Sequence, residues 1–445
     1  MAETLKKFPI GGLHLPEEKE LTTGKPIETM TPPAQVAIPL KQHAGVASRP
    51  VVEAGTKVRR GTLIAMNDQG LGARIHASIP GTVAGIEQRP LQDGQMVDAI
   101  VIDHDPSLDG DDERMEPIAD ADLTPEAVRQ RVEEAGIVGL GGAGFPTHIK
   151  LKPSPETPID TVLINGAECE PYLTVDDRLM QEEARALFRG LEIIRMTVGA
   201  EQGIAACEAN KPAAMQILRE EAKNWEHLEA VALDTRYPHG AEKHLIKAVL
   251  DREVPKNSLP SKVGCVVNNV QTTIAITRAI DRGEALTHRV LTVSGRAVER
   301  PSNVAVPVGA SMEDIIEYCG GATQSDAHLI IGGPMTGLRI YDTGIPVVKA
   351  TSGIVLLTPE DSTEYQELVC IRCGKCVEVC PMYLAPNNIV SYVRNDMLDE
   401  AVAAGLQDCI LCGACAFACP SRRGLLQTLK RGKAELANRQ RAGAK

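Results

Sequence analysis

The sequence predicts a multidomain α/β protein, in which a small β domain, a parallel-sheet α/β domain, a β-grasp-like module and a cysteine-rich C-terminal domain follow one another. Three observations support this prediction. The chain has 445 residues, whereas a single hydrophobic core stops growing at roughly 250 to 300 residues. Strand-like and helix-like segments alternate through the middle of the chain, and two cysteine runs of the same spacing lie near its end.

The composition is typical of a globular, cytosolic protein. Hydrophobic residues make up 43% and charged residues 24%, which argues against wholesale disorder. No apolar run approaches the roughly 18 residues of a spanning helix, and MAETLKKFPIGGLHLPEEKE contains no signal-peptide stretch. The net charge of −12 argues against sequence-independent binding to nucleic acid, which depends on clustered Lys and Arg. We therefore expect a cytosolic protein with no nucleic-acid partner.

Residues 1–110 are expected to form the β domain. Short apolar runs separated by Gly and Pro fill residues 36–103, a pattern typical of short strands. Within it, VVEAGTKVRRGTLIA and ARIHASIPGTVAGI resemble the two halves of a biotinyl/lipoyl-type hairpin. The tip between them reads MNDQGLG and contains no lysine to modify. We expect residues 52–86 to be a scaffold and not a swinging arm.

Residues 111–285 are expected to form the parallel-sheet domain, after an acidic linker. Thr124 is predicted to cap a helix that has Pro125 at its first position. Helix-like and strand-like segments then alternate, and this alternation predicts a parallel sheet with crossover helices. The strands are expected at 161–165, 203–207 and 228–233, and the helices at 178–198 and 212–225.

The last part of the chain divides into three. Residues 286–360 contain the strand-like HRVLTVSG and NVAVPVG, the helix-like SMEDIIEYCGG, and AHLIIGGPMTG, which together suit a β-grasp-like module. Residues 361–425 contain the cysteine runs, and residues 426–445 are a basic tail. From Arg423 onward, Leu425, Leu426 and Leu429 stand among basic residues, so a short amphipathic helix is possible. A solvated helix face and docking on an acidic or membrane partner are both open interpretations.

CIRCGKCVEVCP and CILCGACAFACP share the spacing C-x2-C-x2-C-x3-C and a final proline. Disulfides are rare in a reducing cytosol, and zinc ribbons separate their cysteine pairs by a long spacer. Three closely spaced cysteines suit three corners of an iron-sulfur cubane, and in two-cluster bacterial ferredoxins the fourth cysteine binds the other cluster. The sequence therefore predicts a ferredoxin-like domain with two [4Fe-4S] clusters. Their ligands are Cys370, Cys373, Cys376 and Cys419 for the first, and Cys409, Cys412, Cys415 and Cys380 for the second.

GLGGAG, Gly139 to Gly144, matches the pattern G-x-G-x-x-G. A dinucleotide-binding fingerprint requires a strand before this loop, whereas a capped helix precedes it here. An ordinary glycine-rich turn is one interpretation. The other is a site where backbone amides approach a phosphate or a flat cofactor ring.

Polar side chains follow this loop and the next predicted strand. GFPTHIK leads to Lys150, and the strand TVLIN ends in NGAECEP, which places Asn165, Glu168 and Glu170 at its carboxyl end. Parallel sheets bind ligands at the carboxyl ends of their strands. A surface ion pair is the alternative, but together with the glycine loop these residues favour a binding site.

These segments resemble two related families. GLGGAGFPTHIK and NGAECEP resemble the FMN- and NADH-binding loops of the flavin subunit of complex I, and YPHGAEKHLI and NNVQT resemble later elements of it. The paired cysteine runs, the biotinyl-like domain, GGLHLPEEKELT and IGGPMTG resemble the RnfC family, the electron-input subunits of Rnf ion-translocating complexes. The resemblance extends over residues 8–420. It implies a barrel-sandwich-hybrid-like first domain, a flavin-binding sheet domain and an SLBB-like β-grasp module.

The resemblance also implies roles for individual residues. Phe145 would stack against the nicotinamide nucleotide, and Glu170 would accept a hydrogen bond from it. Ala167, Cys169 and Ala241 depart from the complex I pattern. The residues expected around FMN are Gly139, Gly141, Gly142, Lys150, Asn165, Glu168, Glu242, Asn268, Asn269 and Thr272.

The function implied is that of an NADH:acceptor oxidoreductase subunit. A flavin accepts a hydride and releases single electrons, so FMN would pass electrons between NADH and the two clusters, and onward to ferredoxin, and no side chain need act as a general base. The resemblance implies a peripheral subunit on the cytoplasmic face of the inner membrane, bound to other subunits of an Rnf-type complex. Two interpretations stay open beside it. One is an iron-sulfur relay or scaffold without a working flavin site, and the other is a soluble flavin-dependent dehydrogenase or hydrogenase subunit.

Overall fold

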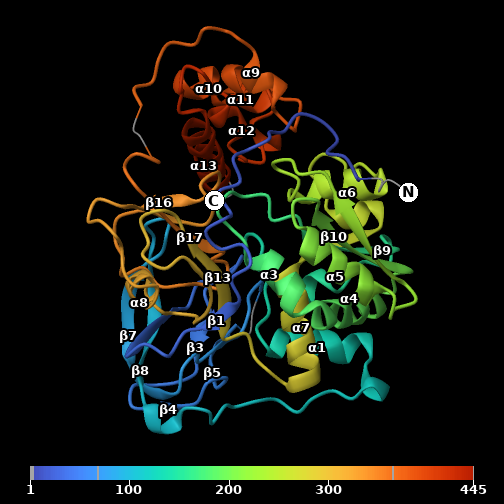
Figure 1. The fold of residues 1–445 in the computed structure, drawn as a ribbon, viewed down its shortest axis with the longest axis vertical. Coiled ribbons are helices and arrows are strands. Elements are labelled where there is room, and N and C mark those ends of the chain that lie inside the picture. Colours follow the sequence, from blue (N-terminus) through green and yellow to red (C-terminus); the bar gives the residue numbers. More distant parts are fainter. Residues whose placement is uncertain (1–4, 68–69, 363–364, 444–445) are drawn as a thin grey trace.

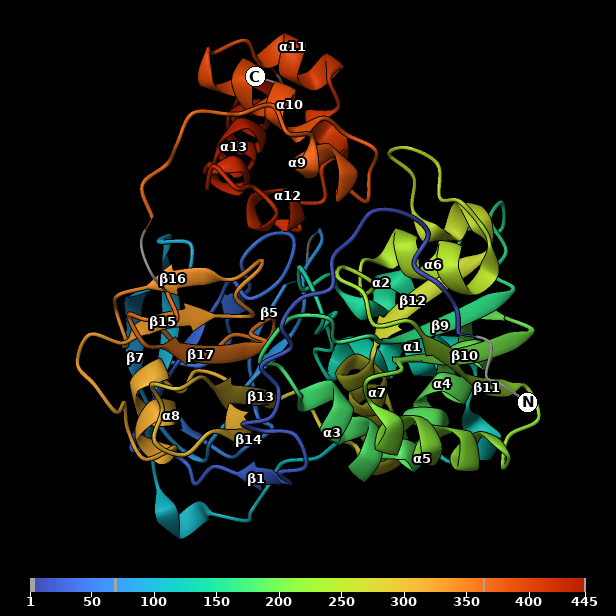
Figure 2. The same ribbon diagram turned by 45° about the horizontal axis from the view of Figure 1, so that its top comes forward.

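The computed structural model describes residues 5–67, 70–362 and 365–443. The outer ends of the predicted first domain and of the basic tail, and the centre of the MNDQGLG tip, lie outside the described residues. Figure 1 shows two sheet-containing halves side by side, with the helical C-terminal domain above them. Turning the molecule forward leaves this arrangement clear (Figure 2).

The first domain is built from two small antiparallel sheets. The two sheets share one core, in which Ile38, Ile64, Ile100 and Ile102 lie. One sheet has the order β2-β8-β7-β4 and the other β3-β5-β6. The strands are β2 (Gln35–Pro39), β3 (Arg49–Pro50), β4 (Lys57–Val58), β5 (Leu63–Met66), β6 (Ile75–His76), β7 (Gly81–Pro90) and β8 (Met96–His104).

The second domain is a four-stranded parallel sheet with helices on both faces. Its order is β11-β10-β9-β12, and Val162 and Ile164 face one helical layer while Leu163 faces the other. Thr124 caps the first helix, as predicted, by accepting from Ala127 N. The strands are β9 (Thr161–Gly166), β10 (Gln202–Glu208), β11 (Leu228–Leu233) and β12 (Cys265–Asn269). Helices α1 (Pro125–Glu134), α4 (Ala184–Val198), α5 (Pro212–Ala222) and α7 (Val270–Arg282) cover one face, and α6 (Glu242–Leu250) covers the other.

The single helix expected at residues 178–198 is two helices. α3 (Val175–Glu182) ends before Glu183, whose backbone leaves helical geometry, and α4 starts at the next residue. The Glu183 carboxylate forms an ion pair with Arg278 on α7. The expected strands are all present, and the predicted helix at 212–225 corresponds to α5, which ends at Ala222.

The third module is a six-stranded mixed sheet with one helix, α8 (Met312–Tyr318), that begins with a capping box at Ser311. The order is β1-β14-β13-β17-β15-β16. Its first strand comes from near the N-terminus and pairs in parallel with β14, which the sequence pattern did not indicate. The strands are β1 (Ile27–Thr29), β13 (His288–Ser294), β14 (Ser302–Pro307), β15 (His328–Ile331), β16 (Leu338–Ile340) and β17 (Gly353–Leu357).

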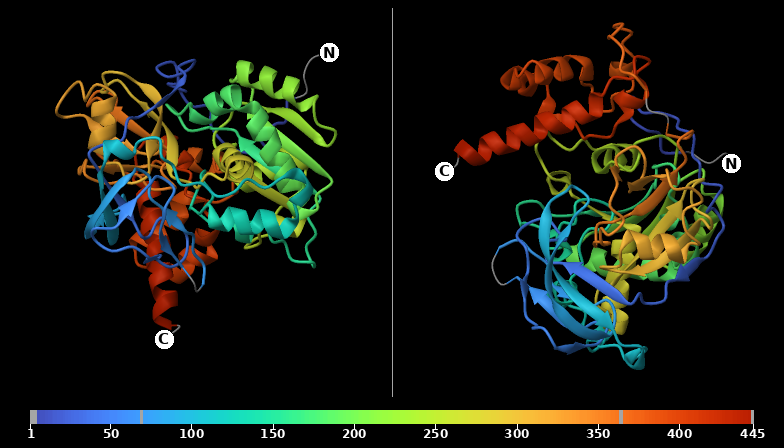
Figure 3. Two further views of the ribbon diagram at one scale, coloured as in Figure 1. Left: turned by 90° about the horizontal axis from the view of Figure 1, so that it is seen from below. Right: turned by 90° about the vertical axis from the view of Figure 1, so that its left-hand side faces the viewer.

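The C-terminal domain is helical. Ile389, Val393, Leu406, Leu425 and Leu429 form its core. The predicted short tail helix is longer than expected. Its first half packs on α10, and its end projects from the domain (Figure 3). The helices are α9 (Lys375–Glu378), α10 (Pro386–Arg394), α11 (Leu398–Ala403), α12 (Ala414–Phe417) and α13 (Leu425–Gly443), and the 3-10 turns lie at 106–108, 120–122, 260–263 and 406–408. None of the helices in the described part of the chain is both long and apolar enough to span a membrane.

Residues 5–22 form an extended N-terminal strap that joins the domains. Lys6 bonds through its backbone to the end of β11, at Ala232 O and Asp234 N. Gly12 N donates to Val379 O in the C-terminal domain, and Leu13 exchanges two backbone hydrogen bonds with Tyr237. The strap therefore holds the C-terminal domain against the parallel-sheet domain.

Lys349 is a buried residue whose hydrogen bonds link three domains. It belongs to the third module and is 1% exposed. Its Nζ donates to Arg74 O in the first domain at 2.6 Å and to Gly136 O after α1 at 2.7 Å. A neutral amine can supply both of these hydrogen bonds. Burial lowers the pKa of Lys349 to about 7.

We expect this buried lysine to make stability depend on pH. Between pH 7 and 10.5 the unfolded chain binds a proton that the folded chain does not, so stability rises with pH, by up to about 1.4 kcal/mol per pH unit. Lys349→Met should remove this contribution and flatten the rise of Tm between pH 7 and 9. Lys223→Met, at an exposed lysine, is the control. A wild-type slope in Lys349→Met would contradict the assignment.

Candidate functional site

A cavity of about 780 Å³ opens at the carboxyl ends of β9 and β12. The two strands are neighbours, and Asn165 is the register partner of Asn269. The chain runs from β9 outward to β10 and β11 and then returns to the opposite side of β9, so the cavity lies at a topological switch point of the sheet. Every residue predicted for FMN or NADH lines it, namely Gly139, Gly141, Gly142, Phe145, Lys150, Asn165, Glu168, Glu170, Glu242, Asn268, Asn269 and Thr272.

The glycine loop forms one wall of the cavity and is clamped from behind. Gly139 N donates to Phe145 O, which closes the loop on itself. Leu140 N donates to Thr272 Oγ1 at 2.9 Å. A Cβ on Gly141 would lie 2.9 Å from the Asn269 Cβ, whereas a Cβ on Gly142 would meet nothing within 4 Å. Packing against Asn269 therefore leaves no room for a side chain at Gly141. At Gly142 the backbone faces open space in the cavity.

Lys150 supplies positive charge to this wall. It ends the short helix α2 (Thr147–Lys150) that follows the loop. Its Nζ lies 3.3 Å from Glu242 Oε1, at the start of α6, and donates to Val267 O in the middle of β12. These two contacts hold the ammonium group at the cavity, and about a third of the side chain stays accessible.

Glu168 fixes the opposite wall. Its carboxylate accepts from the backbone amides of Asp176 and Asp177, at 2.7 and 3.2 Å, and so caps the first turn of α3. Its own backbone has a φ of 45°, and Lys19 of the strap donates to the carbonyls of Glu168 and Glu170 at 3.0 Å each. Burial raises the pKa of Glu168. The loop geometry is thus held on one side by the Glu168 carboxylate at the start of α3 and on the other by Lys19, which bonds to the loop carbonyls from the strap.

Glu170 contacts the IGGPMTG loop of the third module. Its carboxylate oxygens accept from Met335 N at 3.0 Å and from Thr336 Oγ1. A Cβ on Gly333 would lie 2.4 Å from Glu170 Oε2, so this glycine permits the contact. Burial raises the pKa of Glu170. The carboxylate predicted to bind the nucleotide is therefore positioned jointly by two domains.

A third carboxylate, Asp176, lies at the base of the cavity. Its Oδ2 accepts from Asn269 Nδ2 at 2.7 Å, while burial, and then the neighbouring Glu168, raise its pKa to about 7. Arg289, from β13, is 1% exposed and donates to Leu140 O and to Gln271 Oε1. A cation and a carboxylate are thus buried together beneath the glycine loop.

The cavity fits the predicted flavin nucleotide. Of the described residues that line it, three present a buried polar atom without a hydrogen-bond partner, namely Asn268 Nδ2, Asp176 Oδ1 and His244 Nδ1. Buried polar atoms without partners are rare in folded proteins and indicate an absent ligand or water. Two faces of the site, bare backbone at Gly142 and the ammonium of Lys150, suit a flat ring system and an anionic group.

Cysteines from both runs lie together in the C-terminal domain. A small apolar cavity is lined by Cys380, Cys409, Cys412 and Cys415, the four residues expected for one cluster. The thiols of Cys370 and Cys419 both lie close enough to Cys376 to raise its pKa, although burial is the larger cause. No three acidic, histidine or cysteine side chains in the described ranges converge on a single metal ion, and the corners of a cubane are more widely spaced than the ligands of one ion.

The flavin-side cavity reaches the cysteine domain directly. Ile410 and Cys412 are part of its lining. Tyr237 Oη donates to Cys412 O at 2.6 Å, and His244 Nε2 lies 2.9 Å from Pro381 O. One cavity therefore contains the predicted nucleotide residues and a predicted cluster ligand.

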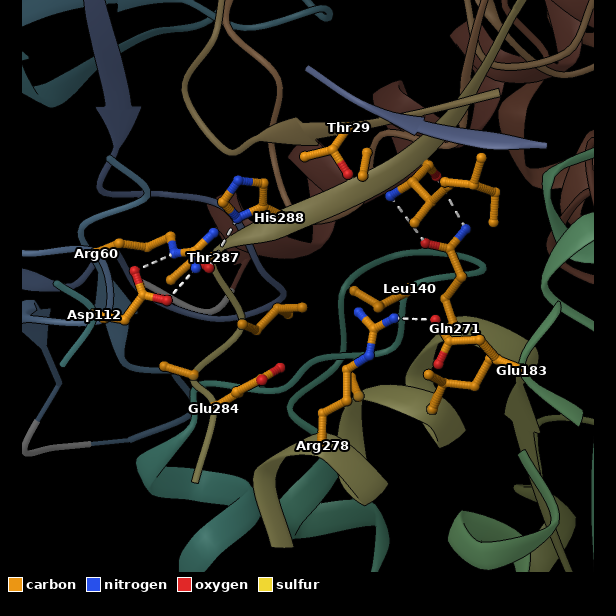
Figure 4. Close-up of a pocket in the computed structure, with 18 of the residues that line it drawn as sticks. Thr29, Arg60, Asp112, Leu140, Glu183, Gln271, Arg278, Glu284, Thr287 and His288 are labelled. Atoms are coloured by element: carbon orange, nitrogen blue, oxygen red, sulfur yellow. Dashed lines mark hydrogen bonds and ion pairs between the residues drawn. The ribbon is translucent and has the colours of Figure 1, made fainter. Parts of the chain in front are cut away.

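A second cavity of about 380 Å³ lies behind the glycine loop and shares Leu140 and Gln271 with the first. Figure 4 shows two ion pairs in its lining, Arg60 with Asp112 and Arg278 with Glu183. His288 is half-buried there, and desolvation lowers its pKa to about 4. None of the residues predicted for FMN, NADH or the clusters belongs to this lining.

Sequence comparison places the chain in a family. It is 41% identical, over 89% of its length, to a subunit of the proton-translocating ferredoxin:NAD(+) oxidoreductase complex of Clostridium ljungdahlii, and covers 86% of that protein. It is 39% identical to the corresponding subunit of the Na(+)-translocating ferredoxin:NAD(+) oxidoreductase complex of Acetobacterium woodii, with 97% of this chain and 98% of that protein covered. The chain belongs to the RnfC family.

Family models match every domain of this RnfC-family chain. They are the RnfC barrel sandwich hybrid domain at residues 7–107, the Nuo51 FMN-binding domain at 132–278, the SLBB domain at 290–339 and the 4Fe-4S dicluster domain at 368–425. The predicted fold class and the cofactors, FMN and two [4Fe-4S] clusters, are confirmed. Among solved structures, the H2-reduced NAD+-reducing [NiFe]-hydrogenase has a TM-score of 0.50 at 20% identity, covering 72% of this chain and 67% of that one. That similarity concerns the fold.

Several residues of the RnfC-family site were not identified from the sequence. Lys19, Asp176, Tyr237 and Arg289 hold or line the flavin-side cavity. Lys19 and Tyr237 belong to GGLHLPEEKELT and YPHGAEKHLI, segments that carry the family resemblance, but neither was assigned a role in the site. Arg289 was the one of these residues that could have been suspected from the sequence. It lies near the start of an apolar strand, and a charged residue buried there must be paired or hydrogen-bonded.

Proposed function

We propose that this chain is the electron-input subunit of a membrane-bound ion-translocating oxidoreductase, and that it passes electrons between NADH and ferredoxin. The observation that carries the proposal is the shared cavity, in which the nucleotide-side residues and Cys412 meet. Relatives at about 40% identity are named as subunits of ferredoxin:NAD(+) oxidoreductase complexes, which supports the same activity and the same kind of partners here.

In this function the chain positions its cofactors and needs no general base. Bound FMN would accept two electrons as a hydride and release them one at a time. We propose that the glycine loop, Lys150 and the asparagines of β12 hold it, that Glu242 and Thr272 close the site, and that Asn165 and Glu168 fix its edge. Phe145, which is 41% exposed at the cavity mouth, offers a stacking surface to the nicotinamide nucleotide.

We propose that the two clusters act in series. The inner cluster, held by Cys380, Cys409, Cys412 and Cys415, adjoins the flavin-side cavity. The outer cluster is held by Cys370, Cys373, Cys376 and Cys419. Because only the inner ligand set reaches that cavity in the described structure, electrons would cross the inner cluster first. The chain would act as a peripheral subunit on the cytoplasmic face of the membrane, bound to the other subunits of the complex.

Anaerobic purification followed by iron and flavin analysis tests the proposal. We expect about eight irons and one FMN per chain, with NADH bleaching both chromophores. A full complement of iron without flavin, even after FMN is added, would instead identify an iron-sulfur relay.

Replacing Glu170 tests the nucleotide side. Glu170→Gln should raise the KM for NADH by about tenfold to a hundredfold, because a charge-assisted hydrogen bond contributes about 1.5 to 3 kcal/mol. Flavin and iron contents should stay unchanged. Thr336→Val, which removes a partner of Glu170 but no carboxylate, should raise the KM less. An unaltered KM in Glu170→Gln would remove this residue from the nucleotide site.

A further inference from the structure

The two cysteine runs have the same spacing but opposite surroundings. The loop of the second run is covered by protein. A Cβ on Gly413 would lie 2.7 Å from Met335 O, and Cys412 O accepts from Tyr237. These contacts come from the third module and from the parallel-sheet domain, which together supply the flavin-side cavity. The loop of the second run therefore contacts the same domains from which its cluster would receive electrons under the proposed function.

The loop of the first run, residues 365–377, is bare. A Cβ on the equivalent glycine, Gly374, would meet nothing within 4 Å. Cys373 is exposed, whereas the other cysteines of the two runs are half-buried or buried. Figures 1 and 2 show this segment along the outer side of the helical domain, away from the three sheet-containing domains. We call residues 365–377 the outer loop.

The outer loop is strongly apolar for an exposed segment. Val369 is 86% exposed and Ile371 is 68% exposed, and Tyr365, Leu368 and Val377 are exposed as well. Single exposed apolar side chains are ordinary, but a contiguous apolar patch on a soluble surface indicates an interaction site. Here the patch surrounds the most exposed cluster cysteine.

The charges around the outer loop are mainly basic. Arg372 and Lys375 are exposed on it, and the Arg422 guanidinium lies over the Tyr365 ring at 3.3 Å. The carboxylate of Glu367 is paired with Arg394 and Arg423, and Glu378 is exposed beside the loop. A partner with an apolar contact face and an acidic rim would complement it.

We propose that the outer loop is the docking face for the neighbouring subunit of the complex that exchanges electrons with the outer cluster. The partner face is apolar with an acidic rim and presents its own one-electron redox centre, and one electron crosses per event with no bond made or broken. The proposal rests on the proposed function. The second cysteine run contacts other domains of this chain, and we assign to the first run an equivalent contact with another subunit.

Rebinding to depleted membranes tests the docking face. Membranes from cells that make the complex without this subunit are mixed with purified chain, and both sedimentation and NADH-driven reduction of the membrane cofactors are measured. Leu368→Glu combined with Val369→Glu should weaken rebinding at least about tenfold and reduce transfer equally. Iron content and NADH-dependent reduction of a soluble dye should stay within about twofold of wild type. Met96→Glu, at an exposed apolar residue of the first domain, is the matched control and should rebind normally.

A second measurement covers the case in which the double variant loses its clusters. A cysteine placed at the exposed Gln366 should react with a maleimide in the free chain and become protected once the chain is bound to the membranes. Undiminished labelling, or wild-type rebinding by the double variant, would overturn the proposal. Normal rebinding with loss of electron exchange with added ferredoxin would also overturn it, since the occupant would then be ferredoxin. If wild type rebinds through this face but holds no flavin, the proposed function fails while the docking face stands.

Discussion

Replacing Cys412 by Ser should stop NADH from reducing the outer cluster. The variant loses a ligand of the inner cluster, so the iron content should fall from about eight to about four, while the cysteines of the outer cluster are untouched. Because the inner ligand set adjoins the flavin-side cavity, the remaining cluster should stay oxidised when NADH is added. Flavin bleaching should persist, because the nucleotide side is intact. Electron paramagnetic resonance of the NADH-treated protein measures both outcomes.

Cys373→Ser is the matched variant. It removes an exposed ligand of the outer cluster, so the iron content should again fall to about four, but NADH should still reduce the cluster that remains. Reduction of the surviving cluster in both variants, or in neither, would contradict the proposed order. Unchanged iron in either variant would mean that the replaced cysteine is not a ligand.

Gly141→Val should abolish flavin binding. Even a single added Cβ would lie 2.9 Å from the Asn269 Cβ, and Asn269 also holds Asp176 and begins α7. The branched side chain must therefore displace the glycine loop or the end of β12, and both carry predicted flavin contacts. Flavin should fall from one per chain to background, while iron stays at about eight. Equal loss of flavin and iron would mean that the loop supports the whole fold.

Gly142→Ala distinguishes crowding by the protein from crowding by the flavin. The protein has room for a Cβ at this position, so the apoprotein should keep its stability. Loss of flavin in this variant would show that the ring itself lies against Gly142. Retention of flavin would show that Gly141 alone requires bare backbone.

Local patterns account for what could be predicted from the sequence. The strands of the parallel sheet, the Thr124 cap and the cysteine spacing are each set by residues close together in the chain. Asn165 and Asn269 could be assigned to one site because the carboxyl ends of neighbouring parallel strands share an edge. The bend at Glu183 could not be read from a helical pattern, because its partner, Arg278, lies on a distant helix.

The supporting residues of the site depend on tertiary contacts. Lys19 reaches the Glu168 loop from the N-terminal strap, and Arg289 reaches the glycine loop from the third module. Asp176 is notable only because Glu168 caps its helix and buries it. None of these pairings leaves a periodic or spacing signal, so sequence reasoning found the residues that would face the cofactor and missed those that hold them.

The N-terminal strap leaves the ribosome before the domains that it joins, and it is among the last parts able to take up its place. Its backbone partners include Tyr237 and Val379, so it cannot take up its place until the cysteine-rich domain has been synthesised and has folded. Before that moment the strap does not yet fasten this domain to the parallel-sheet domain, and the site of the inner cluster is less enclosed than in the finished protein. The topology therefore makes the final enclosure of the inner-cluster site depend on synthesis of the C-terminal domain, because the strap residue Gly12 bonds to Val379 beside Cys380.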